Sequence, residues 1–206
     1  QGEPLQCAAI LPEVFTPCED APRPTLIYYY RKFSQRAVEW PEMAVNHRPQ
    51  LHWWVSNGYV VFLPDINFRV GLPGETATDC LTSGTDRIIQ LGSADPDRVA
   101  LHGHSWSGYQ TAFAITKTDR FACAIAGAPV SNMTSAYSGI RYGTGLARQF
   151  QYEQSQSRIG ASLWERRDLY IDNSPVFFAD RIHTPLVLMF GDEDGAVPWT
   201  QGVELY

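Results

Sequence analysis

The chain has 206 residues, which is enough for one large hydrophobic core but too few for two comfortable domains. Its composition, 44% hydrophobic and 18% charged, is ordinary for a globular protein, and its formal net charge of −6 argues against the basic patch that a nucleic-acid surface needs. No run approaches the roughly 18 to 20 consecutive apolar residues of a membrane span. We therefore expect a single domain over residues 1–206, with neither a nucleic-acid partner nor a membrane span.

In chain order, six short apolar segments predict the strands of one sheet. They are Leu5–Leu11, Thr25–Tyr30, Tyr59–Leu63, Val99–His102, Cys123–Gly127 and Pro185–Phe190. The last five segments lack a regular alternation of polar and apolar residues, which is typical of strands that are buried on both faces of a parallel sheet.

Helical stretches fall between these strands, at Pro49–Ser56, Thr76–Leu91 and Ser107–Thr116. Alternating strands and helices predict an α/β fold, a mostly parallel sheet with helices on both faces. Residues 131–180 contain no predicted strand, only short helical pieces. In such a fold an insertion of this kind is expected over the carboxyl end of the sheet, where ligands bind.

The cysteines add little to this picture. None of the four forms a Cys-x-x-Cys pair, so a zinc knuckle is disfavoured. Cys7 and Cys18 could bridge one loop if the protein is exported. Cys123 lies in an apolar run and is expected to be a small buried side chain.

The strongest chemical signal is the hexapeptide Gly103–Gly108, with the sequence GHSWSG, between an apolar strand and a helix. A serine on a sharp strand-to-helix turn is the nucleophile elbow, and small residues two positions before and after the serine make room for that turn. Gly103 meets this requirement. Ser107 stands where glycine is usual, but serine is also small. The pattern predicts that Ser105 is a nucleophile.

The second signal is the sequence GDEDGAVP, which follows directly on the strand Pro185–Phe190. An acid at the carboxyl end of a strand, downstream of the serine, is where this fold carries the acid of a catalytic triad. Asp192, Glu193 and Asp194 all compete for that role. The alternative is an acidic turn that precedes the helix expected from about Trp199.

Three motifs in this order, GHSWSGY, AGAPVSNM and GDEDGAVP, resemble the prolyl oligopeptidase family of serine peptidases, whose catalytic domains have the α/β-hydrolase fold. The resemblance extends from the strand Thr25–Tyr30 to Tyr206. It is closest to the dipeptidyl-peptidase and acylaminoacyl-peptidase branches.

This resemblance implies specific roles for individual residues. Ser105 matches the nucleophile, and Asp194 matches the aspartate of the triad. Tyr30 matches a tyrosine whose hydroxyl helps form the oxyanion hole, although the Gly-Gly-Pro that often follows that tyrosine is absent here. The second oxyanion donor would be the backbone N–H of Trp106.

Val130 and Val197 match residues that line an apolar pocket for the substrate residue before the scissile bond. Tyrosines that flank this pocket in proline-specific members do not align convincingly, so a preference for proline is not implied. The resemblance also implies a peptide substrate, no cofactor, no metal, and a β-propeller domain elsewhere in the parent protein.

A triad of this type needs a histidine after the aspartate, and no histidine follows Asp194. The histidines present, none of which is favoured as the base, are His47, His52, His102, His104 and His183. We therefore expect a histidine beyond Tyr206, together with a missing C-terminal strand and helix. We also expect little hydrolase activity from this chain alone, and an exposed apolar edge at Pro185–Phe190.

Three other functions remain open at this stage. A carboxylic-ester hydrolase would use the same triad, although the sequence lacks an HGGG-type oxyanion motif. A non-catalytic binding module could retain the fold without the histidine. A metal site at His102 and His104, or at Asp192 and Asp194, is disfavoured because no further ligands occur at a usual spacing.

Overall fold

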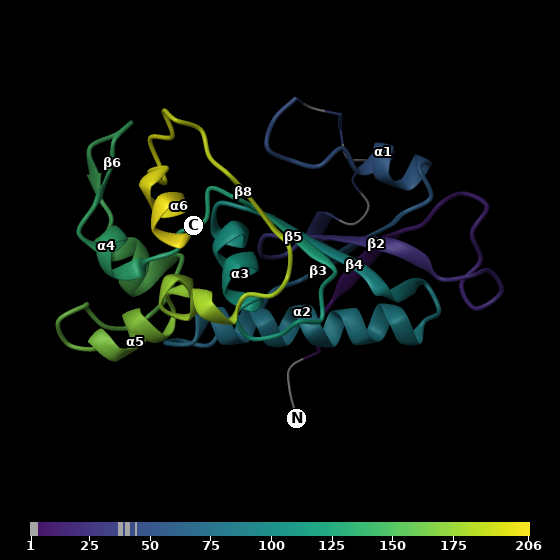
Figure 1. The fold of residues 1–206 in the computed structure, drawn as a ribbon, viewed down its shortest axis with the longest axis horizontal. Coiled ribbons are helices and arrows are strands. Elements are labelled where there is room, and N and C mark those ends of the chain that lie inside the picture. Colours follow the sequence, from purple (N-terminus) through teal and green to yellow (C-terminus); the bar gives the residue numbers. More distant parts are fainter. Residues whose placement is uncertain (1–3, 37–38, 40–41, 44) are drawn as a thin grey trace.

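The structure is a computed structural model that describes residues 4–36, 39, 42–43 and 45–206. A six-stranded sheet crosses the molecule (Figure 1) in the order β1-β3-β2-β4-β5-β8, and only the edge strand β1 runs antiparallel to its neighbour. The strands are β1 (Cys7–Ile10), β2 (Arg23–Tyr28), β3 (Val60–Pro64), β4 (Ala94–His104), β5 (Cys123–Gly127) and β8 (Leu186–Met189). All six predicted strands are therefore present, and the mostly parallel sheet is confirmed.

Helices cover both faces of the sheet. Neighbouring residues along a strand point to opposite faces, and apolar side chains on each face pack against a helix. Val61 and Leu63 of β3 pack in one apolar cluster with Leu51 of α1 (Leu51–Ser56). Phe62 of β3 packs on the other side in the main core, which includes Leu81 of α2 (Pro73–Gln90). In Figure 1 the long helix α2 runs along one side of the sheet and α1 lies on the other. A short 3₁₀ turn, η1 (Ser34–Arg36), lies between β2 and α1.

Two boundaries differ from the sequence prediction in ways that affect the site. Strand β2 ends at Tyr28, so Tyr30 lies two residues beyond the strand rather than at its last position. Strand β4 begins at Ala94 and continues to His104, directly before the serine of the predicted elbow. The helix α3 (Trp106–Ala114) starts directly after that serine.

The insertion at residues 131–180 contains a pair of strands that the sequence analysis missed. Strands β6 (Ile140–Arg141) and β7 (Leu146–Ala147) form an antiparallel hairpin of two residues each, which is too short to give a periodic signal. The remaining turns are α4 (Met133–Tyr137), the π-helix η2 (Gln151–Ser155), α5 (Arg167–Asp172) and the 3₁₀ segment η3 (Pro175–Arg181). The last helix of the chain is α6 (Thr200–Leu205).

Strand β8 forms the edge of the sheet opposite β1, as expected. Alternate residues along it are exposed, with Val187 at 52% and Met189 at 57%. The prediction of an exposed apolar edge is therefore confirmed. By contrast, Cys123 at the start of β5 is exposed, so the expectation of a buried side chain was wrong. All four cysteines are free, and Cys7 and Cys18 do not form a disulfide.

Candidate active site

The parallel strands end at the same level, and the predicted site residues follow those ends. Tyr28 of β2 is in register with His102 of β4, and His104 is in register with Gly127 of β5. Gly127 is in turn opposite Met189 of β8. Because the carboxyl ends of parallel strands share one edge of the sheet, the loops that follow them converge there.

Ser105 is held in a strained turn between β4 and α3. Its φ is +58° and its ψ is −117°, a backbone conformation that residues other than glycine rarely adopt. Its backbone N–H donates to the carbonyl of Gly127 at 2.7 Å. A Cβ on Gly103 would lie 2.1 Å from the carbonyl oxygen of Ser107, and one on Gly108 would lie 2.3 Å from that of Gly127. The small residues around the serine are therefore required by the close approach of the backbone.

Ser107, which replaces the usual glycine, is part of the turn rather than an obstacle to it. Its buried hydroxyl accepts a hydrogen bond from the N–H of His104 at 2.8 Å and donates to the carbonyl of the same residue at 3.0 Å. The side chain therefore provides partners for two polar groups at the end of β4.

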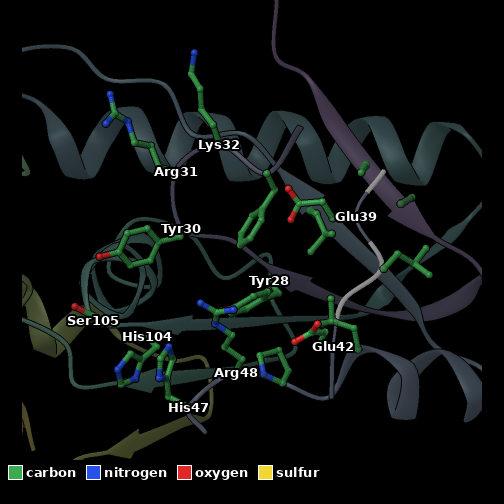
Figure 2. Close-up of a pocket in the computed structure, with 17 residues that line it drawn as sticks. Tyr28, Tyr30, Arg31, Lys32, Glu39, Glu42, His47, Arg48, His104 and Ser105 are labelled. Atoms are coloured by element: carbon green, nitrogen blue, oxygen red, sulfur yellow. The ribbon is translucent and has the colours of Figure 1, made fainter. Parts of the chain in front are cut away.

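Ser105 opens into a cleft of about 1110 Å³ together with Tyr30. Figure 2 shows the phenol ring of Tyr30 and the side chain of Ser105 on the same side of this cleft. The cleft is also lined by charged residues of both signs, among them the cations Arg31 and Lys32 and the acid Glu42. The structure thus brings together the predicted nucleophile and the predicted oxyanion tyrosine.

Two histidines lie in the same cleft, which the sequence analysis did not anticipate. His47 lies outside α1, and its ring stacks on that of His104 with 4.0 Å between the centroids. Burial lowers the pKa of both imidazoles. The charge of Arg48 lowers the pKa of His47 further, and the charge of His47 lowers the pKa of His104 further. The carboxylate of Asp194 is close enough to oppose the shift at His104. Both rings are therefore mainly neutral near pH 7.

The other histidines have different surroundings. His102 lies on β4 with its ring edge against Tyr28, and burial, followed by the charges of His104 and His47, lowers its pKa to about 4. His183 is exposed and pairs with Asp119 at 3.2 Å, before β8 and away from the carboxyl edge. His52 lies on α1. Among the hydrogen bonds of the described residues, none joins a histidine ring to the hydroxyl of Ser105.

The three candidate acids after β8 are not equivalent. Asp192 and Glu193 are exposed, whereas Asp194 is partly buried. The Oδ1 atom of Asp194 accepts hydrogen bonds from the N–H groups of Ala196 at 2.8 Å and Val197 at 3.0 Å. These bonds fix the carboxylate within its turn. Asp194 therefore has the turn-stabilising role considered from the sequence, and its charge is close enough to His104 to act on the pKa of that imidazole.

The two predicted pocket residues, Val130 and Val197, both belong to one apolar cluster that includes Trp106, directly after Ser105. Each is only 4% exposed. Trp106 is the first residue of α3, where a backbone N–H has no partner within the helix. Any partner of this N–H therefore lies outside α3.

Sequence reasoning also missed two residues that shape the site. A Cβ on Gly127 would lie 2.6 Å from Nδ1 of His104, so this glycine leaves room for the imidazole. Gln156, in the insertion, donates a hydrogen bond to the hydroxyl of Tyr30 at 3.1 Å. Gly127 lies in the motif AGAPVSNM but was given no role there, and Gln156 lies in no motif and is 126 positions from its partner. Through this contact the insertion reaches the loop that follows the carboxyl end of β2.

Comparison with known proteins agrees with these features. The model of the prolyl oligopeptidase family matches residues 45–206, which is most of the chain. A probable chloroplastic glutamyl endopeptidase of Oryza sativa subsp. japonica is 26% identical over 212 residues. That match covers 94% of this chain but 21% of the relative. The chain therefore spans about a fifth of the length of this relative.

Solved structures share the fold at low identity. Dipeptidyl peptidase 4 of Porphyromonas gingivalis matches with a TM-score of 0.74 and 20% identity, over 98% of this chain and 27% of that one. Acylaminoacyl peptidase of Pyrococcus horikoshii matches with a TM-score of 0.70 and 21% identity, over 98% of this chain and 32% of that one. With the mostly parallel sheet, these matches show that the fold is that of an α/β-hydrolase.

Proposed function

Because this chain belongs to the prolyl oligopeptidase family, we propose that it is the catalytic domain of a serine peptidase, with helical insertion 131–180, in which Ser105 forms an acyl-enzyme. The observation that carries the proposal is the strained turn of Ser105, with φ at +58°, opening into the same cleft as Tyr30. A side chain held in this conformation at the end of a buried strand presents its hydroxyl to the cleft.

The proposed reaction proceeds in two halves. The Oγ of Ser105 attacks the carbonyl carbon of the scissile peptide bond while a histidine accepts its proton. The carbonyl oxygen becomes an oxyanion that accepts hydrogen bonds from the hydroxyl of Tyr30 and the N–H of Trp106. The tetrahedral intermediate then collapses to an acyl-enzyme as the histidine returns the proton to the leaving amine. A water molecule, deprotonated by the same histidine, releases the acid product and regenerates Ser105.

Asp194 is the proposed acid of the triad. Its Oδ1 is held by two backbone N–H groups, and its Oδ2 accepts no hydrogen bond from a residue in the described part of the chain. A carboxylate that is fixed through one oxygen can accept the Nδ1–H of a histidine through the other, which sets the tautomer of the ring. We propose that this histidine lies outside the 206 residues, because the triad order of the fold places it after the aspartate.

The proposed substrate is a peptide, with an apolar pocket for the residue before the scissile bond at Val130 and Val197. These side chains belong to the same apolar cluster as Trp106, the residue after the nucleophile. The resemblance further suggests a β-propeller domain in the intact protein that would restrict access to the cleft.

A fluorophosphonate probe tests the nucleophile and the base together. The adduct is located by peptide mass mapping on this chain and on the intact protein, with Ser105→Ala as the control. The proposal expects labelling at Ser105 in the intact protein and little in this chain alone. No labelling in either form would favour a non-catalytic module.

The stacked histidines of the cleft, His47 and His104, are the alternative candidates for the catalytic base. Labelling of Ser105 in the isolated chain, abolished by His104→Gln or His47→Gln, would assign the base to this pair and contradict a base outside the chain. Matched peptide and ester substrates, assayed on the intact protein, then distinguish a peptidase from an ester hydrolase.

A further inference from the structure

Three hydrogen bonds between side chains connect the hydroxyl of Tyr30 to an arginine in the insertion. Arg141 donates from Nη2 to Oε1 of Gln151 at 3.0 Å, and Gln151 donates from Nε2 to Oε1 of Gln156 at 2.6 Å. Gln156 completes the series by donating from Nε2 to the hydroxyl oxygen of Tyr30 at 3.1 Å. We call these three residues, Arg141, Gln151 and Gln156, the glutamine relay.

The direction of this relay is fixed by its first member. A glutamine amide has one end that accepts hydrogen bonds and one that donates them, and the two ends have nearly the same shape. A guanidinium group has only donors, so Gln151 must turn its oxygen toward Arg141. Its NH₂ group then faces Gln156, which must in turn present its own NH₂ group to Tyr30. The hydroxyl of Tyr30 is therefore an acceptor in this bond.

The local backbone aligns the two glutamines. They lie at the start and just beyond the end of the π-helix η2, and the N–H of Gln156 donates to the carbonyl of Gln151 at 3.1 Å. This wide turn brings residue i+5 back over residue i, whereas a regular α-helix would bring back residue i+4. Gln151 is only 7% exposed, which holds the middle of the relay rigid.

We propose that Gln156 is a positioning residue for the oxyanion hole, an inference that rests on the proposed function. A hydroxyl whose oxygen already accepts a hydrogen bond has its proton directed elsewhere, and here the cleft with Ser105 is the open direction. Donors that are aimed in advance at a developing oxyanion need no reorganisation during the reaction. Accepting a bond also makes the hydroxyl a stronger donor, through cooperativity between linked hydrogen bonds.

The test compares variants of Gln156 with matched variants of Gln154, an exposed residue of the same π-helix. In the intact protein, Gln156→Met removes the bond to Tyr30 and should lower kcat about tenfold with KM nearly unchanged, less than the 10²- to 10³-fold cost of deleting an oxyanion donor. Gln156→Glu should lower kcat further, because a carboxylate can only accept and would take the proton of Tyr30. Gln154→Met and Gln154→Glu should match the wild type.

A double-mutant cycle separates positioning from general damage to the fold. If Gln156 acts through the hydroxyl of Tyr30, then Gln156→Met should have no further effect on kcat in a Tyr30→Phe background. If Gln156→Met prevents folding, Arg141→Met at the partly buried far end of the relay replaces it in the cycle. An equal loss of kcat with and without the hydroxyl would overturn the proposal.

The outcomes also distinguish the relay from the function on which it rests. Full activity of Ser105→Ala would overturn the proposed function itself. Full activity of Tyr30→Phe would remove the oxyanion role of Tyr30, and the relay with it. A large loss in Tyr30→Phe, together with Gln156 variants that behave like the Gln154 controls, would overturn the relay alone.

Discussion

At the scale of single residues, the site depends on side chains that support the backbone next to the nucleophile. Ser107 is the clearest case, because its hydroxyl bonds both the N–H and the carbonyl of His104. The usual glycine at this position has no side chain with which to make these bonds. The departure from the motif is therefore compensated by two hydrogen bonds.

Removing the hydroxyl of Ser107 should destabilise the fold. Ser107→Ala leaves the N–H of His104 without its partner, and an unsatisfied buried group costs about 1 to 3 kcal/mol. Urea unfolding should show a decrease of this size in the free energy of unfolding. Ser83→Ala is the matched control, because Ser83 is an exposed serine that bonds carbonyls of its own helix, and it should change little. Equal effects in the two variants would contradict the role assigned to Ser107.

His102 should make stability depend on pH. Burial lowers its pKa from 6.5 to about 4, so between these values the unfolded chain binds more protons than the folded one. The free energy of unfolding therefore has its full contribution from the neutral imidazole above pH 6.5, and this contribution is lost as the pH falls toward 4. The loss is at most about 3.5 kcal/mol, since each pKa unit corresponds to about 1.4 kcal/mol.

Replacing His102 tests this dependence. His102→Gln should reduce the decrease in the free energy of unfolding between pH 7 and pH 4.5, measured by urea unfolding at both pH values. The exposed His183 provides the control, because surface pairs such as His183 with Asp119 contribute little to stability. A pH dependence that is unchanged in His102→Gln would contradict this account.

At the scale of elements, the close contact between α3 and β5 holds the strained turn in place. Gly108 of α3 lies against the carbonyl of Gly127 at the end of β5, the same carbonyl that accepts the N–H of Ser105. The helix, the strand and the serine therefore meet at one oxygen atom. Any side chain at position 108 must push this arrangement apart.

Gly108→Ala should therefore destabilise the protein even though alanine favours helices over glycine. The added Cβ would lie 2.3 Å from the carbonyl oxygen of Gly127, and overpacking of this kind costs about 1 to 3 kcal/mol. Thermal unfolding should show a clearly lower midpoint. At Gly143 a Cβ meets nothing within 4 Å, so Gly143→Ala should leave the midpoint nearly unchanged. A Gly108→Ala protein as stable as the wild type would contradict the close contact.

The elements differ in how far the sequence could predict them. The apolar runs identified all six sheet strands. A central strand such as β3 is buried on both faces and leaves a continuous hydrophobic signal, and the edge strands β1 and β8 are apolar although alternate residues along them are exposed. The hairpin of β6 and β7 has two residues in each strand, and the π-helix η2 is defined by backbone hydrogen bonds rather than by a residue pattern. Such elements leave no periodic trace in the sequence.

The residues of the site also divide into those with a local sequence signal and those without one. Ser105 could be predicted because the steric demands of its turn are local, within two residues on either side. The hydrogen bond from Gln156 to Tyr30 joins residues 126 positions apart, and the stacking of His47 on His104 joins separate segments. These contacts depend on how the insertion and the segment before α1 fold over the sheet. A local pattern could not have indicated them.

At the scale of the whole molecule, the open edge of the sheet at β8 is the feature that bears on association between chains. No helix in the described ranges is long and apolar enough to cross a membrane. Among the described residues the sheet ends at β8, where the backbone pairs with β5 on one side only and two large apolar side chains are exposed. Such an edge can pair with the edge of another chain.

The edge at β8 should make the 206-residue chain self-associate. Val187 and Met189 are 52% and 57% exposed on a strand with unpaired backbone groups, and natural edge strands avoid such pairing with charges, especially lysine. Val187→Lys should therefore shift the chain toward monomer in sedimentation velocity experiments over a concentration series. Val14→Lys adds the same charge at a position that is 86% exposed and outside the sheet, so it should leave association unchanged. Equal effects of the two lysines would attribute association to net charge, and a wild-type chain that is monomeric throughout would exclude the edge as a contact.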